Sequence, residues 1–153
     1  MVEKNLQSIF SAWVKANRDK IPSTTVWELK MEKGTSFAFD RVADHQIEAL
    51  LDAKHTGMYH KISDTPVSWG GKMRFTSKKP LDCMLIKNAE AFVVLCFYTP
   101  RKPKETLWID VDRFIEVRDQ SPRKSIQEAE ARLIAHRVEI IRIDRKLSTL
   151  ITT

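Results

Sequence analysis

The chain has 153 residues, of which 42% are hydrophobic and 30% charged, so its composition is that of one globular domain and excludes a disordered chain. Lys and Arg number 26 against 20 acidic residues, and the net charge of +6 favours a polyanionic partner such as nucleic acid. No apolar run approaches the roughly 20 residues that span a bilayer, and the first residues lack a signal peptide's apolar stretch. We therefore expect a single domain over residues 1–153, located in the cytoplasm, with no membrane partner.

The first third of the chain is predicted to fold as a helix, a strand and a second helix. Apolar residues recur at helical spacing over 2–17, and Glu3 lies in the first turn. Residues 24–31 are rich in β-branched and aromatic types and are predicted as a strand. Asp40 is expected to be the N-cap of a second helix over 41–54, which Gly57 ends.

The rest of the chain is predicted to contain several strands and one late helix. The most apolar stretch is predicted as a central strand, and the sequence Ser-Ile-Gln-Glu has the form of a capping box that opens a helix. The predicted elements are strands over 58–63, 81–86 and 91–98, an edge-like strand over 107–111, a helix from Ser125 to about His136, and a strand or helix extension over 138–143. This α+β or α/β pattern predicts a sheet flanked by helices.

Several familiar site motifs are missing from the sequence. With only four glycines, the chain has neither a phosphate-binding loop nor a dinucleotide fingerprint. Cys83 and Cys96 lack the spacing of a zinc site and lie in apolar segments. We interpret them as two buried thiols, with a disulfide as the alternative.

The most informative segment is Glu28-Leu29-Lys30, within the predicted strand 24–31. Because side chains alternate along a strand, Glu28 and Lys30 project from one face and Leu29 from the other. With 10 Glu and 15 Lys in the chain, chance alone gives about one such spacing, so the tripeptide needs its context. The alternative is an exposed ion pair on a solvated strand face, worth under about 1 kcal/mol.

The pair Glu28 and Lys30 suits metal-dependent cleavage of a phosphodiester. This chemistry needs acidic oxygens around Mg²⁺, a water nucleophile and positive charge near the developing phosphorane. Glu28 and the backbone carbonyl of Leu29 are candidate ligands, and Lys30 is the candidate group to activate the water. A second carboxylate is needed, and Asp82 is the best candidate because it opens an otherwise apolar strand, where an acid is costly unless it binds something.

Several segments in the same order resemble one nuclease family. They are Val26-Trp27-Glu28-Leu29-Lys30, Lys33-Gly34-Thr35-Ser36-Phe37, residues 42–50 (Val-Ala-Asp-His-Gln-Ile-Glu-Ala-Leu), the strand from Phe92 to Phe97, and Arg123-Lys124-Ser125-Ile126. Together they resemble the Holliday-junction resolvases of the recombination protein U type, within the PD-(D/E)xK nuclease superfamily. The resemblance implies a restriction-endonuclease-like core, a central mixed β-sheet flanked by helices. It also implies a homodimer that cuts four-way DNA junctions with Mg²⁺, for which Mn²⁺ substitutes, in a prokaryotic or phage-infected cell.

The resemblance carries catalytic roles onto particular residues. Glu28 and Lys30 match the family's acid and lysine, Glu3 resembles its helical acid, which assists the metal site, and Gln46 lies where related nucleases place a site glutamine. The family's aspartate precedes the Glu-x-Lys strand, but here only Asp19 lies in that interval. Lys79-Pro80-Leu81-Asp82 looks like the missing half-motif moved downstream. We therefore favour Asp82 as the second metal ligand, delivered by a hairpin of residues 58–63 and 80–87 beside strand 26–31, and keep Asp19 as the alternative.

Basic and aromatic residues in the predicted loops are candidates for DNA contact. Their alternative role is a solubilising surface, and Trp69 could equally be a hydrophobic plug instead of a base-stacking wedge. The candidates are Lys33, Trp69, Arg74, Lys78, Lys79, Arg101, Lys102, Lys104, Arg123 and Lys124. Two rival functions remain: another PD-(D/E)xK endonuclease of the repair or restriction type, and a non-catalytic basic DNA-binding protein.

Overall fold

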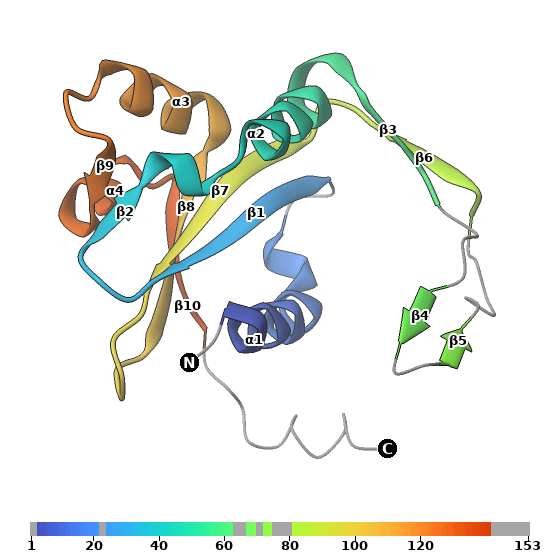
Figure 1. The fold of residues 1–153 in the computed structure, drawn as a ribbon, viewed down its shortest axis with the longest axis horizontal. Helices are drawn as coiled ribbons and strands as arrows, with labels where there is room; N and C mark the ends of the chain where they lie inside the picture. Colours follow the sequence, from blue (N-terminus) through green and yellow to red (C-terminus); the bar gives the residue numbers. More distant parts are fainter. Residues whose placement is uncertain (1–2, 22–23, 63–66, 70–71, 75–80, 142–153) are drawn as a thin grey trace.

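A mixed four-stranded sheet in the order β1-β7-β8-β10 forms the centre of the computed structural model, which describes residues 3–21, 24–62, 67–69, 72–74 and 81–141 (Figure 1). Strands β1 and β7 are parallel, and β8 runs antiparallel to both β7 and β10. The strands are β1 (Thr25–Glu32), β7 (Glu90–Phe97), β8 (Lys104–Asp110) and β10 (Arg137–Ile141). The predicted central strand is confirmed, because β7 lies inside the sheet and is almost wholly buried.

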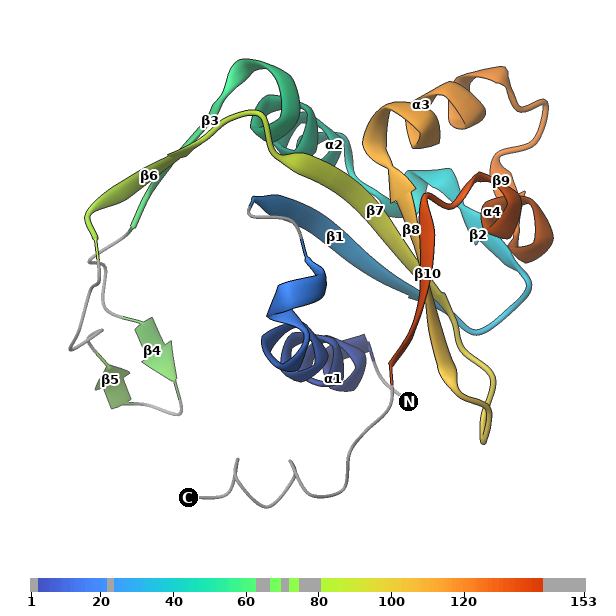
Figure 2. The same cartoon turned by 180° about the vertical axis from the view of Figure 1, so that it is seen from behind.

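Helices cover both faces of this sheet, as the sequence predicts. Helix α1 packs on one face, while α2, α3 and α4 pack on the other (Figure 2). The helices are α1 (Glu3–Ala16), α2 (Asp44–Leu51), α3 (Val111–Gln120) and α4 (Glu128–Ile134). Three short helical turns accompany them: η1 (Arg18–Lys20), η2 (Phe39–Arg41) and η3 (Asp52–Thr56). Strands β2 (Ser36–Ala38) and β9 (Ser125–Gln127) form a separate small sheet. The protein is therefore a mixed α and β fold with a central mixed sheet flanked by helices.

Strand β1 separates its polar and apolar side chains as the alternation predicts. Trp27, Leu29 and Met31 pack with α1 on one face of the sheet. Glu28 and Lys30 lie on the other face, where Val26 packs against the core beneath α2. The pattern of β1 therefore fixes which helices surround the Glu-x-Lys pair.

The α1 side of the sheet is held by aromatic packing around Trp108 on β8. The Trp108 ring is fully buried, and the rings of Phe10, Trp27 and Phe92 lie 5.5, 5.9 and 5.6 Å from it, centroid to centroid. Its indole N–H donates to Thr106 Oγ1 at 3.2 Å. The guanidinium of Arg137 lies 4.1 Å over the same ring. Such packing ties α1, β1, β7 and β10 to the middle of the sheet.

A two-stranded ribbon, here called the arm, leaves the domain between η3 and β7. It consists of β3 (Met58–Lys61) and β6 (Cys83–Ile86), paired antiparallel, and it extends away from the main sheet in both views (Figures 1 and 2). Gly57, with a φ of +114°, and Asn88, with a φ of 57°, turn the chain at its base. Farther along the chain, β4 (Val67–Trp69) pairs with β5 (Lys72–Arg74), so Trp69 lies in a strand rather than in the predicted loop.

The predicted start of the second helix is wrong. Asp40 lies in the turn η2, and α2 begins only at Asp44, with Ala43 as its N-cap. The turn η2 allows both Phe39 and Val42 to enter the core, which a helix starting at residue 41 would prevent. The helix ends as predicted at Gly57, after the π-type turn η3.

The predicted capping box is also wrong. Ser125 lies in β9 and its hydroxyl accepts from that of Ser36 on β2 at 2.9 Å, so α4 begins at Glu128 instead. Strand β8 is not an edge strand, because residues 137–141 form β10 beside it and bury Leu107 and Trp108. The sequence did not predict α3.

Both cysteines are free, and only one is buried. Cys96 lies in the core under α1, where burial raises the pKa of its thiol to about 11. Cys83 is exposed, which corrects the expectation of two buried thiols, because it lies on the arm, where no described element covers it.

Candidate functional site

The structure brings Glu28, Lys30 and Gln46 together on the α2 side of the sheet. Lys30 Nζ lies 2.9 Å from Glu28 Oε1, and Gln46 Nε2 donates to the same oxygen at 2.7 Å. Glu28 and Lys30 come from β1, two residues apart, whereas Gln46 comes from the third position of α2. The predicted pair therefore forms one cluster with Gln46, which lies 18 residues after Glu28 in the sequence.

The beginning of α2 holds the Gln46 amide in its orientation. The Ala43 backbone N–H donates to Gln46 Oε1 at 3.1 Å, so the amide nitrogen of Gln46 is turned toward Glu28. Ala43 cannot cap the helix with its own side chain, and Gln46 satisfies the Ala43 N–H in its place. Gln46 is thus a positioning residue for the Glu28 carboxylate.

The cluster lies at the border between core and solvent. The Lys30 side chain is 13% exposed and that of Glu28 is 27% exposed. The ammonium of Lys30 is therefore held beside a carboxylate in a partly water-excluded setting, where charges interact more strongly than on an open surface. Both contacts, from Lys30 and from Gln46, are made to the same oxygen of Glu28, Oε1. This arrangement differs from a loose surface ion pair because a third, helix-fixed group fixes its geometry.

The cluster offers a single carboxylate to a metal ion. Mg²⁺ is commonly held by one or two carboxylates together with substrate phosphates and water, so Glu28 fits as one ligand, with the carbonyl of Leu29 next to it in β1. Within the described residues no three His, Cys, Asp or Glu side chains gather to hold a metal ion. A metal site at Glu28 would therefore need a second acid from outside this cluster.

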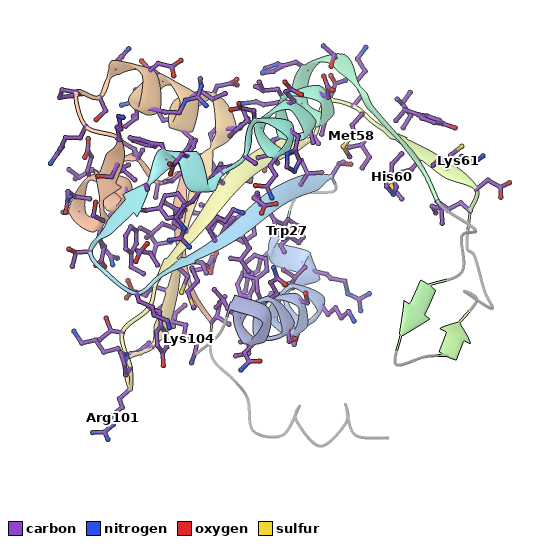
Figure 3. The ribbon with its side chains drawn as sticks, viewed as in Figure 1. Trp27, Met58, His60, Lys61, Arg101 and Lys104 are labelled. Carbon is purple, nitrogen blue, oxygen red and sulfur yellow. The ribbon has the colours of Figure 1, made fainter. Side chains whose placement is uncertain are left out.

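Asp82 lies at the outer end of the arm. The predicted hairpin forms, but β3 and β6 pair with each other in a sheet of their own and β1 pairs with β7, so its predicted position beside strand 26–31 is wrong. Met58 lies at the base of the arm and Lys61 at its outer end (Figure 3). Lys61 pairs with Cys83, and one residue farther out the backbone carbonyl of Asp82 accepts from the Ile62 N–H at 2.9 Å. Strand geometry places Asp82 about 13 Å outward from Ile86.

The other two candidate acids lie on or after α1. Asp19 is exposed in the turn η1, which follows that helix. Glu3 begins α1, whose buried face packs against Leu29 and Met31, on the side of β1 opposite Glu28. The side chain of Glu3 lies outside the described part of the structure, and its supporting role stays a prediction.

Several predicted DNA-contact residues emerge at one end of the sheet. Lys33 follows β1, and Arg101 and Lys102 lie in the loop after β7; because Glu32 pairs with Phe97, both loops leave the sheet at the same end. Arg101 points outward from the tip of its loop, and Lys104 lies nearer the sheet (Figure 3). Arg123 and Lys124 precede β9, and Arg123 forms an ion pair with Glu130 at 3.3 Å. Lys78, Lys79 and the side chains of Trp69 and Arg74 lie outside the described residues.

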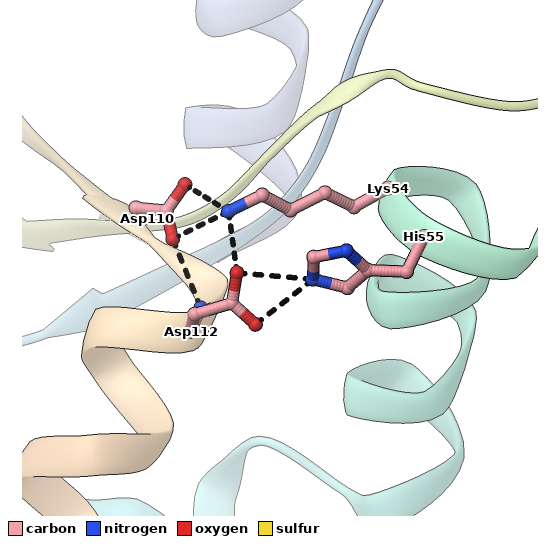
Figure 4. Close-up of polar contacts among 4 residues, drawn as sticks. All are labelled: Lys54, His55, Asp110 and Asp112. Atoms are coloured by element: carbon pink, nitrogen blue, oxygen red, sulfur yellow. Dashed lines mark hydrogen bonds and ion pairs between the residues drawn. The ribbon is translucent and has the colours of Figure 1, made fainter.

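A second charged cluster, not predicted from the sequence, lies where η3 meets the start of α3 (Figure 4). Lys54 Nζ lies 2.7 Å from Asp110 Oδ2 and 2.6 Å from Asp112 Oδ2, and His55 Nε2 lies 3.1 Å from Asp112. Asp110 also caps α3 by accepting from the Asp112 backbone N–H at 3.0 Å. The partners are more than 50 residues apart in sequence, so no local pattern could have revealed them.

This cluster is expected to make the fold sensitive to acid. Burial alone would raise the pKa of Asp112, but hydrogen bonds and positive charge from Lys54 and His55 lower it overall. The pKa of Asp112 is therefore lower in the folded state than in the unfolded state, where it is about 3.9. Above the unfolded pKa the ionised carboxylate stabilises the fold, and this stabilisation is lost as the pH falls through the folded-state pKa. Asp112→Asn should therefore lose less thermal stability than the wild type between pH 5 and about pH 2. Equal losses in thermal melts of the two proteins would contradict this role.

Comparisons with models of known protein families, with curated proteins and with solved structures found no match. In the described part of the chain no helix has the length and apolar character needed to cross a bilayer. Any functional proposal therefore rests on the residues themselves and on the family resemblance of the sequence.

Proposed function

We propose that the protein is a metal-dependent, structure-selective DNA endonuclease that resolves four-way junctions, of the recombination protein U type within the PD-(D/E)xK superfamily. One observation carries the proposal. A strand-borne glutamate forms an ion pair with the lysine two residues later, at 2.9 Å, and accepts a hydrogen bond from a helix glutamine at 2.7 Å. A mixed sheet flanked by helices, with the segments of the resemblance in order, supports the same family.

The catalytic roles follow from the chemistry of each group. Glu28 and the carbonyl of Leu29 are the residues of the main sheet that would hold Mg²⁺. Asp82, at the outer end of the arm, and Glu3, on the helix that covers the other face of β1, would join them only in a placement that differs from the one in this structure. When bound, this ion supplies Lewis-acid stabilisation of phosphate charge and a water of lowered pKa. Lys30, as an ammonium, orients the attacking water and stabilises negative charge in the transition state. Gln46 keeps the Glu28 carboxylate in place, so the carboxylate does not have to reorganise during the reaction.

The proposed DNA recognition depends on charge and shape. Lys33, Arg101 and Lys102 leave the sheet at one end and carry positive charge in exposed loops. Such contacts bind phosphates and carry no sequence information. A four-way junction is defined by its branching, so a homodimer that presents two sites at a fixed separation would select it by geometry.

The proposal predicts paired, symmetric nicks in a four-way junction and little cutting of matched linear duplex in Mg²⁺. The measurement is a gel assay of both substrates, each labelled on one strand at a time, at equal protein excess. Cutting of the duplex at a rate similar to the junction would instead favour a repair or restriction-type endonuclease. Binding of the junction without any cutting would favour a non-catalytic DNA-binding protein.

The same assay decides which aspartate completes the site. Asp82→Ala is expected to lose cleavage while Asp19→Ala retains it, because the half-motif of residues 79–82 accompanies Asp82. Asp19 serves as the matched control, since both are exposed carboxylates and both substitutions remove one charge. The reverse pattern would show that the motif order is not permuted.

A further inference from the structure

The large apolar side chains that the described structure leaves exposed form two separate groups. The first is on or next to the arm, where Leu85 is 69% exposed and Tyr59 is 65% exposed. The second is on α4 and β10, where Leu133 is 87% exposed. The arm group is Tyr59, Leu81, Met84 and Leu85, and the second group, here called the β10 patch, is Leu133, Val138 and Ile140. Contiguous exposed apolar surface of this kind marks a site of association.

Among the residues that the structure describes, no further strand pairs with the arm and no layer of the main domain covers it. Tyr59 lies opposite Leu85 across the ribbon and His60 lies opposite Met84, so both faces of the ribbon carry exposed apolar groups. The register shows that β3 and β6 pair with each other and with no further described strand. An isolated two-stranded ribbon is only marginally stable in water. The arm therefore needs a surface that covers it.

The β10 patch has the complementary character. β10 is the outer strand of the main sheet, and Val138 and Ile140 share the face of β10 opposite Ile141, which is buried. An outer strand also presents backbone N–H and C=O groups that an added segment can pair with. The arm and α4 lie at opposite ends of the molecule in both views (Figures 1 and 2), so the arm lies far from the β10 patch of its own chain.

We propose that two copies of the chain form a two-fold dimer in which the arm of each protomer packs on the β10 patch of its partner. The two-fold axis makes the two contacts identical and closes the assembly, so that no apolar patch is left for further growth.

The area of the two groups suits a stable dimer. With about 200 Å² for a fully exposed large side chain, the exposed fractions of the seven residues amount to roughly 800 Å² per protomer. Two protomers then bury about 1,600 Å², the standard size of a specific protein interface. The inference deepens the homodimer of the proposed function but does not depend on catalysis. A dimer that fails to cut DNA would overturn the nuclease proposal alone.

The first test is the mass of the full chain in solution, by analytical ultracentrifugation over a concentration series. The wild type is expected to be a dimer, and Leu85→Asp and Ile140→Asp should each give a folded monomer, because a charge buried in either half of the contact is costly. Gln120→Asp, on the exposed end of α3, is the control and should stay dimeric. Far-UV circular dichroism checks that each variant is folded. A monomeric wild type, or a dimer that neither substitution weakens, would overturn the proposal.

The second test uses Cys83, an exposed native thiol on the arm on the same side as Tyr59 and Leu85. Ile140→Cys places a second thiol in the β10 patch. Diamide, as oxidant, should join Cys83 of one protomer to the new cysteine of its partner as a disulfide, giving a dimer band that reducing agent removes. Adding Cys83→Ser should abolish the band, and the wild type controls for links between two Cys83 thiols. A chain with Ile140→Cys that gives no more dimer band than the wild type would also overturn the proposal.

Discussion

Replacing Lys30 by alanine is expected to reduce DNA cleavage at least 100-fold while DNA affinity changes little, because the loss of a group that acts on the attacking water affects the chemical step. The Lys30 ammonium lies 2.9 Å from Glu28 and its side chain is only 13% exposed, so water cannot take its place in the same geometry. The rate is measured with protein in excess over labelled junction DNA. The affinity is measured by fluorescence anisotropy in Ca²⁺, which supports binding without the Mg²⁺ chemistry.

Lys33→Ala is the matched control for this variant. It removes the same charge three residues later, but Lys33 is exposed in the turn after β1. It should weaken binding slightly and leave the single-turnover rate at saturation close to that of the wild type. If Lys30→Ala cut at a rate within tenfold of the wild type, Lys30 would not be a catalytic residue.

Replacing Trp108 by alanine is expected to cost about 3–5 kcal/mol of unfolding free energy, because it leaves a large cavity in a packed core. Such a loss is a large part of the 5–15 kcal/mol that stabilises a typical domain. Trp108 is fully buried among aromatic rings from α1, β1 and β7, and Arg137 stacks on it from β10. Urea titration followed by circular dichroism measures the change.

Trp13→Ala is the control for this second variant. Trp13 has the same side chain and touches the same cluster, at 6.4 Å from the Trp108 ring, but it is only partly buried. Its loss should therefore be clearly smaller than that of Trp108. A loss below about 1 kcal/mol for Trp108→Ala would show that this cluster does not hold the sheet together.

The local patterns of the chain predicted the elements that depend on local physics. The alternation in β1 correctly separated Glu28 and Lys30 from Leu29, because side-chain direction in a strand is set by the backbone. The apolar run of β7 correctly indicated a buried strand in the middle of the sheet. The periodicity over 2–17 correctly gave α1.

The errors come from contacts between distant segments. The local pattern predicts Ser125 as a helix cap, but its pairing with Ala38 in β2, and its hydrogen bond with Ser36, 89 residues away, make it part of β9. Likewise, β8 looked like an edge strand because the pairing of β10 could not be seen in its own sequence. Tertiary pairing overrides local propensity in both cases.

The candidate site divides in the same way. The pairing of Glu28 with Lys30 follows from their spacing along one strand, whereas Gln46 was assigned by the family resemblance, and the structure shows that it donates to Glu28. The cluster of Lys54 with Asp110 and Asp112 joins elements 56 and 58 residues apart, and only the fold reveals it. The position of the arm could not be predicted either, since Gly57 and Asn88 set its direction.

The central claim is that Glu28, Lys30 and Gln46 form part of a metal-dependent nuclease centre. The most direct measurement is single-turnover cleavage of a labelled four-way junction in Mg²⁺ and in EDTA, with wild type and Glu28→Gln side by side. We expect paired nicks by the wild type in Mg²⁺, none in EDTA and none by Glu28→Gln in either. A junction that the wild type binds but leaves intact in both Mg²⁺ and Mn²⁺ would contradict it.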